Sequence, residues 1–588
     1  MLRPQRELPR QISDAYVDAL LGLDPITGTY LGTSVGAGRL PDFSPDGAAA
    51  EAELARETLV RLAGRETDAG AGVGAGADAD ADVERRCARL LRERLDAELA
   101  QYEAGEHLRA VNNISSPLHR IRKVFSVMPA RTPEDWAAIA QRLRAVPDCL
   151  GGYRASLAEG VGRGLAAAPR QVRANVAQLE EWLGSEGSGG SKGSKGSEGS
   201  GVSGGGGFGP LATGAPPRLR AEVEAAARVA TEAFAELGEW FRRAYEAQAT
   251  GAGAEDAVGR ERYGRFARHY TGADLDLDEA YAYGWEEFHR LLPEMRAEAQ
   301  RVLPGGQDPW VVLAWLGDHG ESVHGVEETR VWLQRLMDEA VAALDGRHFD
   351  IAEPVRRVES RIAPPGGAAA PYYSQPSLDF TRPGRTWLPT LGRTRFPTHN
   401  LVSTWYHEGF PGHHLQLGHW TFVAAGLSRY QTKVAKVSAT TEGWALYAER
   451  LMDELGFLTD PAHRLGHLDA QMMRAVRVVI DIGMHLRLAI PAHSPFRPGE
   501  RWTPALAREF LGRYSSRPAA YLDSEVVRYL GRPAQSISYK LGERAWLEGR
   551  ERARAKQGPD FDLKRWHMAA LSLGSLGLTD LSSELGSL

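Results

Sequence analysis

The chain has 588 residues, a formal net charge of −6 at pH 7 and a charged fraction of 25%. These values are ordinary for a folded protein, and they show no basic excess of the kind that nucleic-acid binding requires. The basic amino terminus is not followed by an apolar segment, and no apolar run is long enough to span a bilayer, so we expect no membrane partner and a cytoplasmic location. The only cysteines, Cys87 and Cys149, exclude a disulfide framework and a thiolate metal cluster, so any metal must be held by His and carboxylate.

Residues 1–255 are predicted to form a helical N-terminal lobe. Leucines recur at near-helical spacing at positions 90, 91, 95 and 99, and Pro133 follows Thr132 in a typical helix start. The helical pattern covers residues 83–103, 133–146, 169–183 and 218–248.

Two stretches interrupt this pattern. Residues 67–82 are Ala, Gly and Asp repeats with almost no large apolar side chain, so burial could not offset the entropy lost on ordering them. Residues 184–209 are rich in Gly and Ser, a composition typical of a random-coil spacer. We predict disordered loops at both places, the second being either a loop inserted in one domain or a linker between two.

Residues 256–588 are predicted to form a second helical lobe. The helical period is replaced between residues 353 and 397 by Pro, Gly, Tyr and β-branched residues, which predicts two or three short strands. This small sheet would either offer an edge strand to an extended peptide or cover the core as a hairpin. The predicted fold class is therefore mainly α, with a small β region.

The segment directly after this β region carries the clearest chemical signal. His407, Glu408 and His413 come close to the His-Glu-x-x-His pattern, in which two histidines on one helix hold a catalytic zinc and the glutamate takes a proton from water. We therefore predict His407 and His413 as metal ligands, Zn²⁺ as the cofactor and Glu408 as the general base.

The spacing of the two histidines departs from that pattern. Residues six positions apart on a regular helix point in different directions. Pro411 cannot donate an N–H and crowds the preceding turn, so we predict a kink or bulge that loops out two residues and brings His413 into place. His414 returns to the face of His407 but lies about 10.5 Å along the axis, so His413 is the preferred ligand.

A metal held by two histidines needs at least one more protein ligand. Glu442 follows His413 after an interval that suits a turn and a second helix, and it is the predicted third ligand. The helix dipole alone could also favour a glutamate in a first turn. Glu449, two turns further on, competes for the same role or could orient a ligating histidine.

Two further residues are predicted to stabilise an oxyanion. Tyr539 lies at the start of a long helix, and a tyrosine hydroxyl is a suitable donor. His485 lies on an otherwise apolar helix at residues 460–488 and is the alternative.

With these residues assembled, the chain resembles a large bacterial family of unknown function, DUF885. The family's hallmarks are His-Glu-Gly-x-Pro-Gly-His-His, Glu-Gly-Trp-Ala-x-Tyr and Pro-x-Gln-x-x-Ser-Tyr-Lys, which stand here at residues 407–414, 442–447 and 533–540. The family in turn is similar to gluzincin zinc peptidases of the thimet oligopeptidase and carboxypeptidase Taq groups. This resemblance implies the same ligands and base, and a two-lobed helical body with a central channel.

The leading hypothesis is thus a zinc-dependent peptidase that acts on short or extended peptides. The same chemistry could act on a non-peptide amide or ester, and a non-catalytic peptide-binding protein could use the same scaffold. A di-iron helical protein is a further alternative, because Glu286 with His289 and Glu321 with His324 form Glu-x-x-His pairs.

Overall fold

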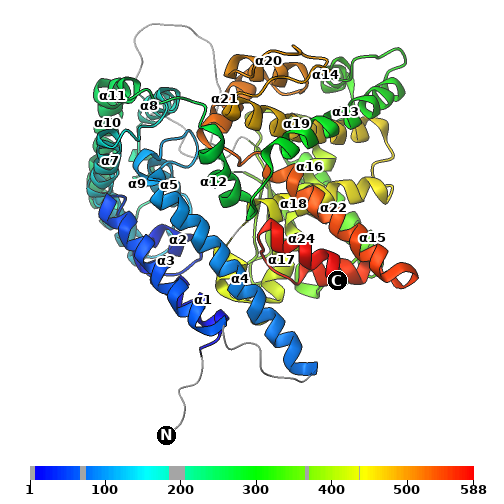
Figure 1. The fold of residues 1–588 in the computed structure, drawn as a ribbon. Coiled ribbons are helices and arrows are strands. Elements are labelled where there is room, and N and C mark those ends of the chain that lie inside the picture. The colour runs from blue at the N-terminus through cyan, green and yellow to red at the C-terminus, as the bar shows by residue number, and fades with distance from the viewer. Residues whose placement is uncertain (1–6, 67–74, 185–205, 364–369, 436) are drawn as a thin grey trace. The chain divides into compact units, whose positions relative to one another are not determined.

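The computed structural model describes residues 7–66, 75–184, 206–363, 370–435 and 437–588 (Figure 1). The chain forms two compact units, the first reaching to Asp256 and including Leu530–Arg532, and the second comprising the described residues that follow Asp256 apart from that short piece. Most elements of both units are helices, which confirms the mainly α fold class. The central channel stays a prediction.

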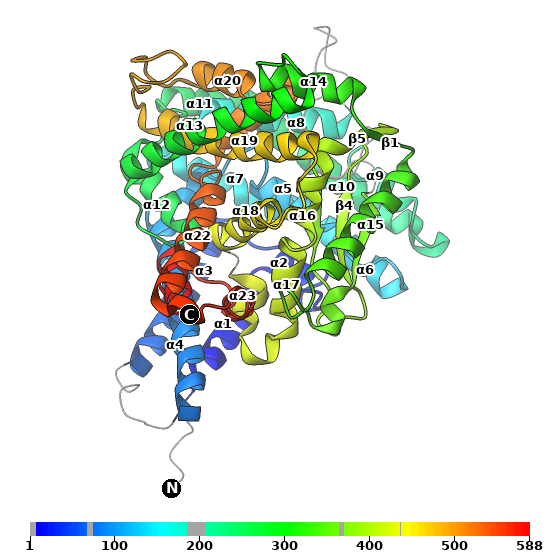
Figure 2. The same cartoon turned by 90° about the vertical axis from the view of Figure 1, so that its right-hand side faces the viewer.

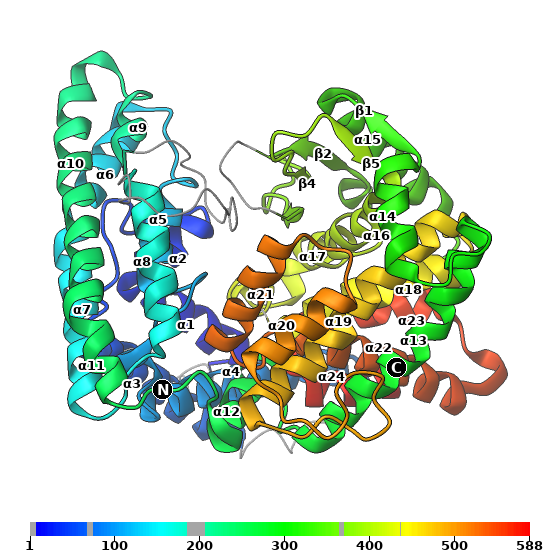
Figure 3. The ribbon, with the colours of Figure 1, turned by 90° about the horizontal axis from the view of Figure 1, so that it is seen from above.

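The first unit is helical throughout its described elements. Its α-helices are α1 (Pro9–Leu23), α2 (Pro25–Tyr30), α3 (Pro45–Glu66), α4 (Ala75–Glu103), α5 (Pro117–Val124), α6 (Pro133–Arg144), α7 (Val146–Gly162), α8 (Pro169–Leu183), α9 (Gly209–Ala212), α10 (Pro217–Trp240) and α11 (Glu246–Gly251). Helix α10 packs along α6, α7 and α8, as Figure 3 shows. Side chains such as Leu143, Leu150 and Phe234 form the buried core between them.

The loop predicted at residues 67–82 is only partly described. Residues 67–74 lie outside the described residues, whereas residues 75–82 belong to α4, so the loop prediction is wrong for them. Alanine has the highest helix propensity of the amino acids, and these alanines lead directly into the amphipathic part of α4. The helix propensity of alanine therefore accounts for a helix where composition predicted a loop.

The Gly/Ser-rich stretch at residues 184–209 also needs a correction at its end. Residues 185–205 lie outside the described residues, but Gly209 begins α9. Phe208 is buried, and its ring packs edge-on against Phe125 and Phe234 at centroid distances of 5.2 and 5.3 Å. The packing of Phe208 thus places the end of the Gly/Ser-rich stretch before residue 209, the end that its composition predicted.

The second unit contains the candidate site. Its α-helices are α12 (Gly259–Thr271), α13 (Leu277–Val302), α14 (Pro309–His319), α15 (Val326–Leu344), α16 (Leu401–Glu408), α17 (His413–Phe422), α18 (Ser438–Glu454), α19 (Pro461–Leu486), α20 (Pro504–Arg513), α21 (Ala519–Gly531), α22 (Ser538–Gln557), α23 (Leu563–Leu571) and α24 (Leu578–Ser587). Helices α13 and α19 lie side by side in both views (Figures 1 and 2). None of the described helices combines the length and apolar character needed to cross a membrane.

Two small sheets precede α16, which confirms the predicted β region. Strands β2 (Val358–Ile362), β4 (Gly384–Leu388) and β3 (Tyr372–Ser374) form one sheet in that order, β2 parallel and β3 antiparallel to β4. Strand β5 (Arg395–Pro397) pairs antiparallel with β1 (Ser322–His324), which lies before the predicted region. Strand β3 is therefore an edge strand, and Figure 2 shows β4 beside α15, α16 and α17.

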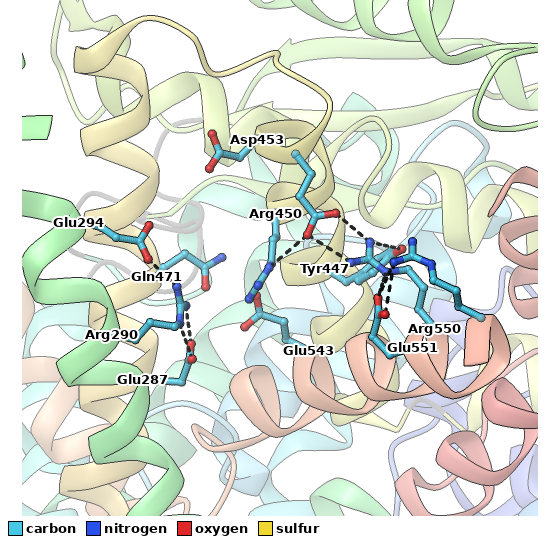
Figure 4. A network of polar contacts seen from close by, with 12 residues as sticks. Glu287, Arg290, Glu294, Tyr447, Arg450, Asp453, Gln471, Glu543, Arg550 and Glu551 are labelled. Atoms are coloured by element: carbon cyan, nitrogen blue, oxygen red, sulfur yellow. Dashed lines mark hydrogen bonds and ion pairs between the residues drawn. The ribbon is translucent and has the colours of Figure 1, made fainter. Parts of the chain in front are cut away.

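A buried lysine ties three helices of this unit together. Lys540 on α22 is fully buried and donates to Glu287 on α13 at 2.8 Å, to Gln471 on α19 at 2.6 Å and to Glu543 at 2.6 Å. In Figure 4 these three partners extend from their separate helices. Because each partner accepts a charge-assisted hydrogen bond, the buried ammonium fixes the position of α22.

Helices α18 and α22 approach closely because two glycines face each other. A Cβ added to Gly542 would lie 2.0 Å from the carbonyl oxygen of Ala439, and one added to Gly443 would lie 2.4 Å from the carbonyl carbon of Gly542. This contact holds Gly443, the residue after Glu442, directly against α22, the helix that carries Tyr539 near its start.

We expect Gly542→Ala to destabilise the protein by about 1–3 kcal/mol, because the methyl group must push two backbones apart. Gly264→Ala is the matched control, since a Cβ at that position of α12 meets no atom within 4 Å. Urea unfolding of both variants measures the difference. Equal stability of the two variants would contradict the close glycine packing.

Candidate metal centre

The metal motif is divided between two helices. Helix α16 ends at Glu408, and α17 begins at His413 after a break that contains a cis Phe410–Pro411 peptide bond. The predicted single helix with a two-residue bulge is therefore wrong in detail, because the helix stops and restarts across four residues. The chain folds back so that Gly412 donates to the carbonyl of Tyr406 at 2.9 Å.

Two features hold this break in shape. A Cβ on Gly412 would lie 2.0 Å from the carbonyl oxygen of His407, so only glycine fits there. The indole Nε1 of Trp444 donates to the carbonyl oxygens of Pro411 and Gly412 at 2.9 and 3.0 Å. Trp444 lies two residues after Glu442, so one segment of α18 both supports the break and carries a predicted ligand.

The break brings the three predicted ligands together. Nε2 of His407 lies 3.5 Å from Oε2 of Glu442, and Nε2 of His413 lies 3.7 Å from the same oxygen. One ligand atom from each residue falls within 4.8 Å of the others, and within the described residues no other group of three or more His, Cys, Asp or Glu does so. We refer to His407, His413 and Glu442 as the triad.

The donor atoms of the triad fit a zinc-sized ion. Ligand atoms about 2.0–2.2 Å from a tetrahedral zinc lie roughly 3.3–3.6 Å apart, close to the two distances from Glu442. Nδ1 of His413 is buried and has no partner among the described residues, so the contact of Nε2 with Glu442 is the polar contact described for this ring. Two imidazoles and one carboxylate also form the donor set of catalytic zinc sites with an open fourth position.

His414 has a different environment. Its side chain is fully buried, with Nε2 2.7 Å from the carbonyl oxygen of Val355 and Nδ1 2.9 Å from the hydroxyl of Tyr373. Both ring nitrogens are therefore engaged away from the triad. This geometry favours His413 over His414 as the ligand and joins α17 to edge strand β3.

Glu449 orients His407. Its Oε1 lies 2.7 Å from Nδ1 of His407, and its Oε2 accepts a hydrogen bond of 2.6 Å from the hydroxyl of Ser403. His467 contacts the same hydroxyl at 3.0 Å, and Arg474 lies 3.2 Å from Oε1. Holding Nδ1 in this way directs Nε2 towards Glu442, which is the arrangement that carboxylate–histidine–zinc sites use.

The same contacts shift the protonation of the site. Burial disfavours the charged imidazole, but hydrogen bonds to Glu442 and Glu449 raise the pKa of His407 to about 9. Burial would raise the pKa of Glu442, yet its contacts with the two triad histidines lower it below the usual range. The Glu442 side chain, the predicted third ligand, is therefore a carboxylate anion at neutral pH, the form in which a carboxylate binds a metal.

Glu408 lies at the end of α16, next to the first ligand. Burial raises its pKa, and the neighbouring His407 and His413 oppose that rise. Among the described residues, its carboxylate makes no hydrogen bond or ion pair. Glu408 therefore lies beside two triad histidines, and no described residue occupies its carboxylate.

Tyr539 faces the same region from α22. Burial and the negative charge of Glu442 raise the pKa of its hydroxyl to about 12, so it is protonated at neutral pH. Its ring lies beneath the guanidinium groups of Arg474 and Arg477, whose Cζ atoms are 6.0 and 5.3 Å from the ring centroid. The placement agrees with a donor role beside the triad.

His485 does not join this cluster. It is buried, its Nε2 lies 3.1 Å from the carbonyl oxygen of Tyr529, and the backbone N–H of Val258 donates to Nδ1 at 3.4 Å. Its ring also packs against Tyr263 at a centroid distance of 5.5 Å. Because main-chain groups hold both ring nitrogens, we withdraw the oxyanion role predicted for it.

The di-iron alternative is not supported by the geometry. Its two Glu-x-x-His pairs lie on α13 and at β1, and neither belongs to a group of three possible ligands within the described residues. His289 stacks on Trp285 at a centroid distance of 5.9 Å. Within the described residues, neither pair therefore forms the site that a di-iron protein requires.

Sequence reasoning missed part of the support around the triad. Ser403 precedes His407 by one helical turn, and His467 and Arg474 are two turns apart on α19. Polar residues that recur on one face of an otherwise apolar helix were the available signal. Trp444 carried no such signal, because its indole donates to carbonyl groups of the break between α16 and α17.

The fold and the site define a mainly helical protein with a divided His/His/Glu metal motif. The chain belongs to the family described as bacterial protein of unknown function (DUF885), which matches residues 25–585. No curated protein matches it significantly.

Solved structures share this fold. A lipoprotein candidate from Colwellia psychrerythraea is 21% identical with a TM-score of 0.79, and the match covers 99% of each chain. A lipoprotein candidate of unknown function from Shewanella oneidensis is 17% identical with a TM-score of 0.72, covering 98% of this chain and 99% of that one. A carboxypeptidase from Pyrococcus furiosus is 10% identical, and its TM-score of 0.28, over 96% of this chain and 98% of that one, does not indicate a shared fold.

Proposed function

We propose that this protein is a zinc-dependent peptidase that hydrolyses short or extended peptides, with His407, His413 and Glu442 as the metal ligands. The observation that carries the proposal is the triad with Glu408 beside it, at ligand separations that suit zinc. A zinc ion bound there would supply Lewis-acid activation of a carbonyl group and of water.

Glu408 moves the proton in the proposed reaction. Its unpaired carboxylate accepts a proton from the attacking water and passes it to the leaving nitrogen of the peptide bond. Burial raises the pKa of Glu408 towards neutral pH. A carboxyl group with such a pKa both accepts a proton from water and releases it to the leaving nitrogen more readily. The hydroxyl of Tyr539 donates a hydrogen bond to the oxyanion that forms on the substrate.

The small sheet offers a means of orienting a peptide. An extended peptide can pair with an edge strand through main-chain hydrogen bonds. Strand β3 is such an edge, and its Tyr373 contacts His414, the residue next to a triad ligand. This position favours the substrate-binding interpretation of the sheet over a purely structural hairpin.

The test is cleavage of a mixed peptide library by the full-length protein, followed by mass spectrometry. We expect products with zinc present, loss of cleavage after chelation and recovery when zinc is restored. Absence of cleavage of every peptide would contradict the peptidase proposal, whereas zinc-dependent cleavage of amide or ester substrates alone would move the same residues to another substrate class.

The cytoplasmic location stays a prediction. The two structural relatives are described as lipoprotein candidates, which supports testing it against a location in the cell envelope. Fractionation of the native bacterium, with detection of this chain by antibody, distinguishes the two.

A further inference from the structure

Arginines line one side of the triad. Arg474 on α19 has Nη2 3.2 Å from Oε1 of Glu449 and 3.4 Å from Nδ1 of His407. Arg477 follows one turn later on the same helix and packs with Arg474 on the ring of Tyr539. Two guanidinium groups therefore lie together on the ring of Tyr539, and one of them also contacts the triad residue His407.

The positive charge of this group is only partly balanced. Nη2 of Arg477 lies 2.9 Å from Oε2 of Glu525, and Arg528 on α21 makes a bidentate pair with the same carboxylate at 2.8 and 2.7 Å. Within the described residues, Glu525 is the one carboxylate that contacts Arg477 or Arg528, whereas Arg474 contacts Glu449. One carboxylate shared by two guanidinium groups leaves one positive charge in excess.

Some donors of this group have no acceptor. No hydrogen bond joins Nε or Nη1 of Arg474, or Nη1 of Arg477, to another described residue. In contrast, Nη1 of Arg528 donates to the side-chain oxygen of Gln535 at 2.8 Å. These nitrogens are not among the buried unpaired side-chain atoms of the described residues, so they reach solvent. The two arginine side chains are 15% and 10% exposed, which leaves room for contact with a ligand but little with bulk water.

We propose that Arg474, Arg477 and Tyr539 form a carboxylate-binding subsite, so that substrates carry a carboxylate close to the scissile bond. A carboxylate matches this set because a guanidinium fork binds it through paired, charge-assisted hydrogen bonds and a neutral tyrosine adds another donor. Either the free C-terminus of a peptide or an acidic side chain supplies this group. The inference rests on the proposed peptidase function and narrows its substrate class.

The test compares matched peptides with the zinc-loaded full-length protein. One pair differs only in its terminus, free acid against amide, and a second pair has an amidated terminus and differs in Asp against Asn beside the cleaved bond. Hydrogen bonds to charged groups predict a kcat/KM that is about 10- to 100-fold higher for the member with the carboxylate. A preference in the first pair assigns the subsite to the C-terminus, and a preference in the second assigns it to a side chain.

The arginine variant supplies the residue-level test. Arg477→Gln is expected to bring the acid-to-amide ratio of the preferred pair towards one, while Arg335→Gln, on the exposed side of α15, leaves the ratio unchanged. The comparison within the wild-type protein needs no variant, so it decides the question even where Arg477→Gln folds poorly.

The outcomes separate this inference from the proposed function. Equal cleavage of both members of both pairs would overturn the carboxylate subsite and leave the peptidase proposal standing. Cleavage of no peptide would overturn both.

Discussion

Replacing Glu408 by glutamine is expected to lower kcat for peptide cleavage by about 10²- to 10⁴-fold, the range that general acid–base catalysis supplies. Glutamine keeps the size of the side chain but cannot accept a proton from water. Because Glu408 is not a member of the triad, the zinc content should stay at the wild-type level. Steady-state kinetics with one cleaved peptide, together with elemental analysis of the same sample, measures both effects.

The control for this variant is Glu548→Gln on α22, whose side chain is 47% exposed and pairs with Arg544. It should retain wild-type kinetics. If Glu408→Gln cleaved peptides as fast as this control, proton transfer would belong to another residue. If instead Glu408→Gln lost its zinc, Glu408 would have to be counted with the ligands.

Glu449→Gln should weaken zinc binding by about 10- to 100-fold, the usual effect of removing a carboxylate that orients a metal-bound histidine. The carboxylate is only 1% exposed and contacts His407, Ser403 and Arg474. Glutamine retains one acceptor but loses the charge that holds Nδ1 of His407 as a donor. Competition with a chelator of known affinity measures the change.

Glu454→Gln is the matched control on the same helix. Its side chain is 37% exposed, pairs with Arg450 and Arg550, and makes no contact with the triad. Equal zinc affinity of the two variants would mean that Glu449 serves packing rather than metal binding. Thermal unfolding of the zinc-free proteins separates a loss of stability from a loss of affinity.

The fold class and the position of the small sheet could be predicted because both depend on local patterns. Helical periodicity marked α6, α8, α10 and α19, and the loss of that period between residues 353 and 397 marked β2 to β5. The pairing of β5 with β1 could not be predicted, because it joins segments that are far apart in the chain.

The triad was predictable because metal chemistry restricts residue types and spacing. The shape of the segment between its histidines was not, since it depends on Trp444 and on the contact between Gly412 and the preceding turn. The roles of Glu449 and Arg474 likewise depend on contacts between different helices, which local sequence patterns do not reveal. The sequence offered Glu449 as either ligand or orienting partner, and the 2.7 Å contact with His407 favours the partner.

His485 shows the limit of reasoning from one helix. A histidine on an apolar helix suggested a functional group, but its nitrogens contact the main chain at Val258 and Tyr529. Those partners come from segments more than 40 residues away, so no local pattern could reveal them. These main-chain contacts indicate a structural role for His485.

Elemental analysis of the purified protein, with His413→Ala and His414→Gln prepared in parallel, tests the central claim most directly. The account predicts about one zinc per chain in the wild type, as a single triad would hold. It further predicts loss of zinc in His413→Ala and retention in His414→Gln, whose native nitrogens already bond Val355 and Tyr373. Retention in His413→Ala, loss only in His414→Gln, or no zinc in any of the three proteins would contradict the triad as the metal site.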